Sequence, residues 1–131
     1  MQFSATHKFA RISPRKARLL MNLVRGRDVD DAINLLKFAK QRSSGMIEKV
    51  IRSAVANANE QEVAQSRNTF FVAKAWVDPG PVIKRFQPKD RGKAYPINKR
   101  TSHLVVTIDE RGEGEEAPQH NLVGRRPGKA R

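Results

Sequence analysis

Basic side chains without acidic partners are the residues of this chain that could do chemistry, and they lie in two segments. Residues 1–27 contain seven lysines and arginines and no acidic residue. Residues 79–103 contain another seven against a single aspartate, Asp90. The rest of the chain balances its charges, so these two segments account for the whole net charge of +13. Cations gathered in this way attract a polyanion, and nucleic acid is the first candidate.

The mixture of lysine and arginine favours contact with RNA. Arginine makes planar, multidentate contacts with phosphate and stacks on bases, whereas lysine acts as a point charge. Both suit irregular RNA, where phosphates of several strands converge and bases are exposed. The two segments predict RNA contacts by Lys8, Arg11, Arg15, Lys16, Arg18, Arg25, Lys84, Arg85, Lys89, Arg91, Lys93, Lys99 and Arg100.

The histidines form no catalytic or metal-binding pattern. His7, His103 and His120 lie far apart in the sequence, and Ser102 and His103 are neighbours rather than members of a triad. A small hydrolase that uses His103 therefore has little support, and we expect Ser102 and His103 to be structural or to contact RNA. The chain has no cysteine, which excludes disulfides and thiolate metal sites. We expect no enzymatic activity, no metal and no cofactor.

Membrane association is not expected either. The chain lacks a run of about 18 apolar residues that could cross a bilayer, and no apolar signal-peptide core follows Met1. An acid-free N-terminus is also a feature of organellar transit peptides, but here it has the pattern of a strand and a helix that belong to the fold.

Alternation and helical spacing predict the elements that position the cations. Residues 2–12 read as a strand whose apolar side holds Phe3, Ala5, His7 and Phe9. Ser13 and Pro14 start a helix that ends at Gly26. A second helix opens at Asp28 or Asp30, and a third runs from about Ser43 to Asn59 with an unbroken apolar stripe.

Two further strands, Thr69–Val77 and Leu104–Ile108, flank the second basic segment. Residues 79–103 between them predict a long, irregular β-hairpin arm with its tip near Lys89–Lys93. About twelve residues per strand, at roughly 3.3 Å each, would reach about 35–40 Å. A two-stranded hairpin is marginally stable alone, so the arm needs a partner, and its charge predicts an anionic one.

The sequence thus predicts an α+β fold: a small three-stranded antiparallel sheet packed with three helices, a long protruding β-hairpin and a disordered C-terminal tail. Residues 1–110 are expected to form a single domain, and 111–131 a flexible tail. Phe70 and Trp76, at strand spacing, are predicted to be core residues.

Three stretches in order resemble one protein family. They are Arg11–Arg18 with Arg25-Gly26, then Ser53–Asn59, then Asp78–Arg85 with Lys99–His103. Together they are similar to the bacterial form of the large-subunit ribosomal protein family numbered twenty-two, over residues 3 to about 110. The arm departs from the family at two places: Pro88-Lys89-Asp90 stands where Pro-Arg-Ala is usual, and Gly92-Lys93-Ala94 stands where Gly-Arg-Ala is usual.

This resemblance implies a structural constituent of the cytoplasmic ribosome that binds large-subunit ribosomal RNA and assists assembly. It implies a body near the exit of the nascent-polypeptide tunnel and a hairpin whose tip lines that tunnel. Partners would be the RNA, neighbouring ribosomal proteins and the nascent polypeptide, with no stable homo-oligomer. The tunnel-facing tip would comprise Val82, Ile83, Lys84, Arg85, Lys89, Asp90, Arg91, Gly92 and Lys93. The alternative from charge alone is a free-standing RNA or DNA chaperone without a fixed site.

Overall fold

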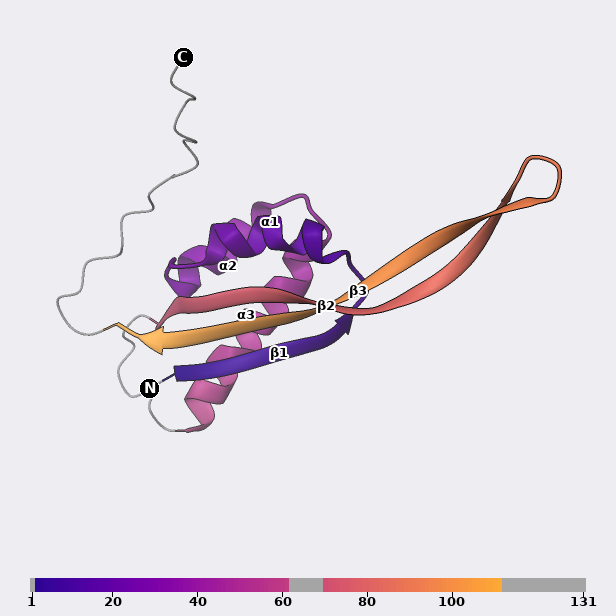
Figure 1. The fold of residues 1–131 in the computed structure, drawn as a ribbon. Helices are drawn as coiled ribbons and strands as arrows, with labels where there is room; N and C mark the ends of the chain where they lie inside the picture. The colour runs from indigo at the N-terminus through magenta and orange to yellow at the C-terminus, as the bar shows by residue number, and fades with distance from the viewer. Residues whose placement is uncertain (1, 62–69, 112–131) are drawn as a thin grey trace, which may run out of the picture.

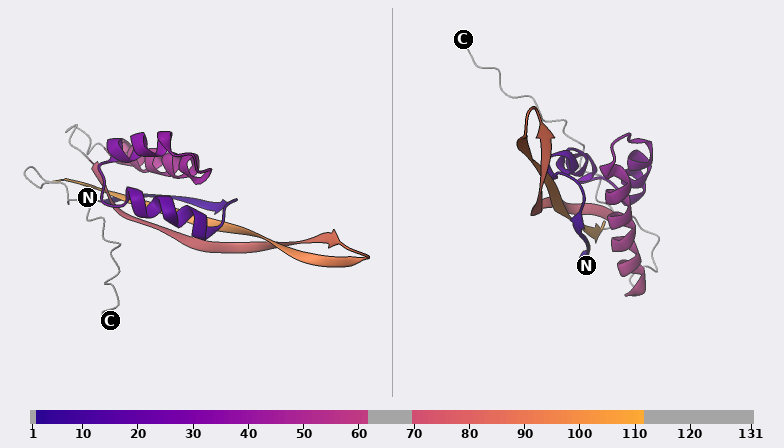
Figure 2. Two further views of the ribbon diagram at one scale, coloured as in Figure 1. Left: turned by 90° about the horizontal axis from the view of Figure 1, so that it is seen from above. Right: turned by 90° about the vertical axis from the view of Figure 1, so that its right-hand side faces the viewer.

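One strand, three helices and two further strands follow one another along the chain (Figure 1). The computed structural model describes residues 2–61 and 70–111. The elements are β1 (Gln2–Ala10), α1 (Pro14–Val24), α2 (Val29–Phe38), α3 (Ser43–Glu60), β2 (Phe70–Lys89) and β3 (Lys93–Glu110). The strands form an antiparallel sheet in the order β1-β3-β2, and the helices gather on one face of it (Figure 2). The predicted α+β fold class is confirmed.

Cross-strand register brings apolar residues of all three strands to the face that the helices cover. Phe3 lies opposite Ile108, and Val72 lies opposite the same isoleucine from the other side. α3 packs against β1 and β3, whereas α1 packs against β2. The core is completed by fully buried helix residues, which include Leu20, Met21, Leu36, Ile47 and Ile51.

A bulge in β2 reverses which side chains face this core. Strict alternation from Phe70 would place Trp76 on the same side as Phe70. The register shifts between Val72 and Lys74, so that Ala75 is buried and Trp76 is 41% exposed. The prediction of Trp76 as a core residue is therefore wrong, whereas Phe70 does pack against the core.

β1 has a comparable irregularity near its end. The register shifts between His7 and Ala10, and Phe9 has a φ of 59°. Phe9 is therefore 60% exposed instead of sharing the buried side of Phe3. Its ring packs edge-on against His103 with the centroids 5.0 Å apart, and its backbone N–H donates to His103 Nδ1 at 3.0 Å.

β2 and β3 continue beyond the body as a two-stranded arm (Figure 1). Their pairing extends from Pro79 opposite Ser102 to Lys89 opposite Lys93. The turn 90–92 closes the arm with three positive φ angles of 38°, 48° and 80°. The predicted hairpin and the position of its tip are confirmed, and both strands are longer than predicted because the arm is paired through most of its length.

The arm leaves the body at a close backbone approach. The register of β2 shifts between Pro79 and Val82. Gly80 lies there against Thr101, and a Cβ at Gly80 would come 2.5 Å from Thr101 Oγ1 and 3.2 Å from its carbonyl oxygen. Thr101 is buried, and its hydroxyl donates to the Pro81 carbonyl at 2.6 Å. This hydrogen bond ties the two strands together at the base of the arm.

The last described residue, Arg111, belongs to the folded body. Its Nη1 lies 2.6 Å from Asp28 Oδ1, and its guanidinium lies 5.3 Å from the centre of the Phe71 ring. The remainder of the predicted tail, 112–131, lies outside the described residues.

Candidate nucleic-acid interface

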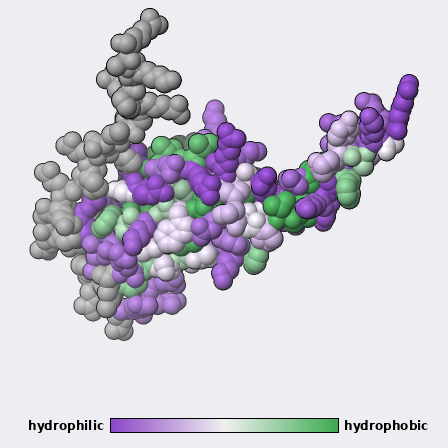
Figure 3. Space-filling view, in the orientation of Figure 1, coloured by the Kyte–Doolittle hydropathy of each residue, from purple (hydrophilic) through white to green (hydrophobic). Residues whose placement is uncertain are grey.

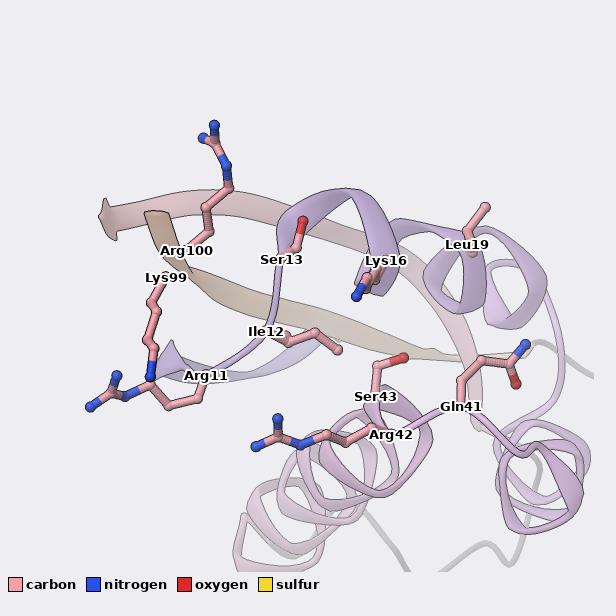
Figure 4. A pocket seen from close by; sticks show the side chains of 10 residues that line it. All are labelled: Arg11, Ile12, Ser13, Lys16, Leu19, Gln41, Arg42, Ser43, Lys99 and Arg100. Atoms are coloured by element: carbon pink, nitrogen blue, oxygen red, sulfur yellow. The ribbon is translucent and has the colours of Figure 1, made fainter. Parts of the chain in front are cut away.

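The two basic segments, distant in sequence, meet where the arm leaves the body. Arg11 and Lys16 of the first segment and Lys99 and Arg100 of the second line one cavity of about 640 Å³. Figure 4 shows these side chains around the entrance to α1 and the base of the arm. Arg42, which immediately precedes α3, is a fifth cation, and none of the described residues that line the cavity is acidic. The sequence predicted two contact surfaces, whereas the structure joins them at the base of the arm. We call this place the root, and the cavity there the root cavity.

From the base of the arm, basic residues continue to its tip, and Figure 3 shows hydrophilic surface at that end of the arm. All seven are exposed: Lys84, Arg85, Lys89, Arg91, Lys93, Lys99 and Arg100. Across the strands, Lys84 lies opposite Asn98 and Lys99 lies opposite Ile83, so neither faces a carboxylate. Within the described residues none of the seven forms an ion pair. Their charges are therefore available to an external anion.

At the tip, like charges face each other. Lys89 lies directly opposite Lys93, an arrangement that destabilises an isolated sheet. The Lys89 ammonium also lies 5.9 Å from the centre of the Tyr95 ring. An anionic partner would relieve the repulsion, so the tip is better suited to a bound state than to free solution.

Apolar side chains on the arm are exposed among the cations. Phe86 is 76% exposed, Tyr95 48% and Val82 39%. None of the three described helices covers this part of the sheet (Figure 1). Flat rings beside cations can stack on unpaired bases while the cations hold phosphates.

Two of the predicted RNA contacts on the body also hold the edge of the sheet. Arg18 Nη2 donates to the Val77 carbonyl at 3.0 Å, and Arg25 donates to the Ala75 carbonyl through Nε at 3.1 Å and through Nη2. These carbonyls lie on β2, an edge strand of the sheet. The two arginines therefore cover an edge that would otherwise offer free acceptors to another strand.

The other predicted contacts divide by exposure. Lys8, Arg11, Arg15 and Lys16 are exposed, whereas Ser102 is fully buried and its Oγ has no hydrogen-bond partner among the described residues. His103 is partly buried, and its Nδ1 accepts a hydrogen bond from the backbone N–H of Phe9. Ser102 is thus inaccessible to RNA in this conformation, and the structure gives His103 a role in fixing the end of β1.

Sequence reasoning missed Arg42, because it lies in the segment whose charges balance. The feature that could have identified Arg42 is its position, because it immediately precedes the predicted third helix. The side chain there lies beside the positive end of the helix dipole, an unfavourable place for a cation without an anionic partner.

The described residues contain no group of three or more histidine, cysteine, aspartate or glutamate side chains that could hold a metal ion. No helix among them combines the length and apolarity needed to cross a bilayer.

Comparison with known proteins identifies the family. The model of the family described as Ribosomal protein L22p/L17e matches residues 5–109. The chain belongs to this family. A relative named large ribosomal subunit protein uL22, from Lacticaseibacillus casei, is 48% identical over 108 residues, which are 82% of this chain and 92% of the relative.

Other relatives with that name are similar over their whole length. The one from Bdellovibrio bacteriovorus is 43% identical over 111 residues, which cover 85% of this chain and 100% of the relative. The one from Carboxydothermus hydrogenoformans is 45% identical over 114 residues, which cover 87% of this chain and 100% of the relative. Membership of the family makes the chain a structural constituent of the large ribosomal subunit in the cytoplasm, and not an enzyme.

Proposed function

We propose that this protein binds large-subunit ribosomal RNA through one continuous surface, which runs from the root cavity to the tip of the arm. The observation that supports it best is the set of seven exposed arm cations without ion pairs, joined at the root by Arg11 and Lys16. Family membership makes ribosomal RNA and ribosomal proteins the expected partners.

Binding is driven by phosphate neutralisation. Each lysine or arginine that contacts a phosphate releases condensed counterions, so affinity falls steeply with salt. None of the helices in the described part of the chain buries the apolar side chains of the arm (Figure 1), and RNA that encloses the arm on both faces supplies that cover. In this way the protein bridges separate RNA segments and assists assembly of the subunit.

The proposal includes a passage for the nascent polypeptide. The arm projects from the body (Figure 1), so its tip can reach deep into RNA while the body remains outside. Residues 82–93 would face the tunnel, and the family's known arrangement is the reason for this assignment. We also propose that no stable homo-oligomer forms, because the arm's like charges would repel in a second copy.

The first test removes the arm's charges. We expect the quadruple substitution of Lys84, Arg85, Lys99 and Arg100 by alanine to weaken incorporation into large subunits. It should also lower the slope of log affinity against log salt by about one for each cation that contacts phosphate. A matched control replaces four exposed cations of α2, α3 and the loop between them, namely Lys37, Lys40, Lys49 and Arg52.

The control loses the same charge and should retain most of its incorporation and slope. Equal incorporation by the arm variant and the wild type would overturn the assigned arm contacts. Equal losses in both quadruple variants would mean that charge acts generically. Cosedimentation in high salt adds the stoichiometry: one copy per large subunit supports the proposal, whereas binding in proportion to RNA length supports the free-standing chaperone.

A second test addresses the tip. Shortening the segment Lys89–Lys93 should leave binding mostly intact and alter the tunnel. The root and the two strands of the arm would keep most of the phosphate contacts. Cryo-electron microscopy of subunits that carry the shortened protein would show the change. Loss of all binding would mean that the tip anchors the protein instead.

A further inference from the structure

The root cavity has the size and the polarity of a nucleotide site. Its volume of about 640 Å³ lies in the range of roughly 300–1,000 Å³ that is usual for small-molecule sites. In Figure 4, Arg11, Lys99 and Arg100 lie toward one end, and Leu19 and Gln41 lie toward the other. A phosphate suits the first end, and an apolar ring with a polar edge suits the second.

Two helices begin at this cavity. Ser13, the N-cap of α1, and Arg42, the N-cap of α3, both line it. Neither helix has a side-chain cap or an acidic residue in its first turn. The helices are 11 and 18 residues long, so each presents the positive end of a full dipole that favours an anion.

A buried hydroxyl at the same place lacks a partner. Ser43, the first residue of α3, lines the cavity and is 1% exposed. Its Oγ has no hydrogen-bond partner among the described residues, and in Figure 4 it is directed to the space between Ile12 and Gln41. An unpaired buried hydroxyl is costly, and an oxygen of a bound ligand would remove that cost.

An exposed leucine completes the far end. Leu19 is 64% exposed on α1 although it lines the cavity. Ile12, nearly buried, forms the adjacent apolar wall. The Gln41 amide can donate to and accept from a base edge, and the Arg42 guanidinium offers a plane on which a base can stack.

We propose that this cavity takes one unstacked nucleotide of RNA, with its phosphate among the cations and its base against Leu19 and Gln41. The inference rests on the proposed RNA-binding function and makes it specific: the protein would select RNA with an extruded nucleotide at this point, rather than any duplex. Single-stranded and bulged nucleotides are the usual targets of specific RNA recognition, because their bases can be splayed out.

The test uses the full-length protein and three RNA hairpins of one sequence: one without a bulge, one with a single bulged adenosine, and one with an abasic bulge. We expect the bulged hairpin to bind about tenfold more tightly than the continuous one, because its base can stack on the Arg42 guanidinium and pack against Leu19. The abasic hairpin should lie between them, because it keeps the phosphate and lacks the base. Affinity is measured by fluorescence anisotropy at a fixed salt concentration of moderate strength.

Three variants locate the preference. Leu19→Ser should remove most of the difference between the adenosine and abasic hairpins. Leu23→Ser is its control, because Leu23 is an exposed leucine of the same helix, 43% exposed, outside the cavity lining. Arg42→Gln should weaken both bulged hairpins, with Arg52→Gln as the control on α3. Ser43→Ala should weaken them without lowering the unfolding midpoint of the free protein, because no hydrogen bond is lost.

The outcomes separate this inference from the proposed function. Tight but equal binding of all three hairpins overturns the nucleotide site and leaves RNA binding standing. The site is overturned as well if Leu23→Ser reduces the preference as much as Leu19→Ser. Absence of binding to every hairpin, together with failure to incorporate into large subunits, overturns both.

Discussion

The two long strands β2 and β3 pass through two environments, and the contrast separates the part that holds the fold from the part that remains exposed. In the body, one face of these strands lies under the helices, and Val72, Leu104 and Ile108 are fully buried. In the arm, the same strands keep their pairing, but Phe86 and Tyr95 are exposed. Backbone pairing alone continues the structure beyond the core.

This contrast indicates that the arm contributes little to the free energy of unfolding of the body. Burial of apolar side chains is the dominant favourable contribution to folding, and the arm supplies almost none. Its shape depends on strand pairing, on the root hydrogen bond of Thr101 and on whatever encloses it. Changes in the body should therefore alter global unfolding, and changes in the arm should alter binding.

The largest expected effect on the free energy of unfolding comes from a cavity-forming substitution in the buried part of β3. Leu104→Ala removes a side chain that is 0% exposed, and we expect a loss of about 2–5 kcal/mol in the free energy of unfolding. Its control on the same strand is Tyr95→Ala, which should change that free energy by less than about 0.5 kcal/mol. Urea denaturation followed by circular dichroism measures both. A comparable loss in the two variants would show that arm and body unfold as one packed unit.

A smaller effect is expected at the boundary between the two regions. Gly80→Ala places a methyl group against Thr101 Oγ1 and backbone, and the buried threonine must give up its bond to Pro81. We expect a destabilisation of about 1–3 kcal/mol. Gly45→Ala is the matched control, because a Cβ at Gly45 meets nothing within 4 Å, and alanine in a helix should stabilise by about 0.5–1 kcal/mol. The same sign for both substitutions in urea denaturation would contradict the close approach.

The elements of the body could be predicted from sequence because apolar spacing is a local property. The stripe of α3 and the Ser13-Pro14 start of α1 identify their helices without reference to the rest of the chain. The side of a strand that a residue occupies is less local, because one bulge reverses it. Trp76 was misplaced for that reason: the irregularity at Ala73 follows from the register with β3, and no turn residue marks it.

The cations of the site could also be predicted from sequence, but their arrangement could not. Charge counting finds Lys16 and Lys99 in separate segments, and only the antiparallel topology brings the start of α1 beside the base of the arm. Arg42 is hidden from such counting because it lies in residues 28–78, a segment whose basic and acidic residues balance. For Ser102 the sequence left a structural role and an RNA contact open, and its burial in the sheet favours the structural role.

The smallest expected effect tests the independence of the arm at its far end. Gly92 has a φ of 80° with open space around it, so Gly92→Ala adds backbone strain of about 1 kcal/mol and no clash. We expect exchange of the Lys93 amide, which donates to the Asp90 carbonyl at 3.2 Å, to accelerate about fivefold, in line with that strain. The urea midpoint should stay unchanged, because the tip opens without unfolding the core. A shift of the midpoint as large as that of Gly80→Ala would mean that strain at the tip reaches the body, and the independence of the two regions would be lost.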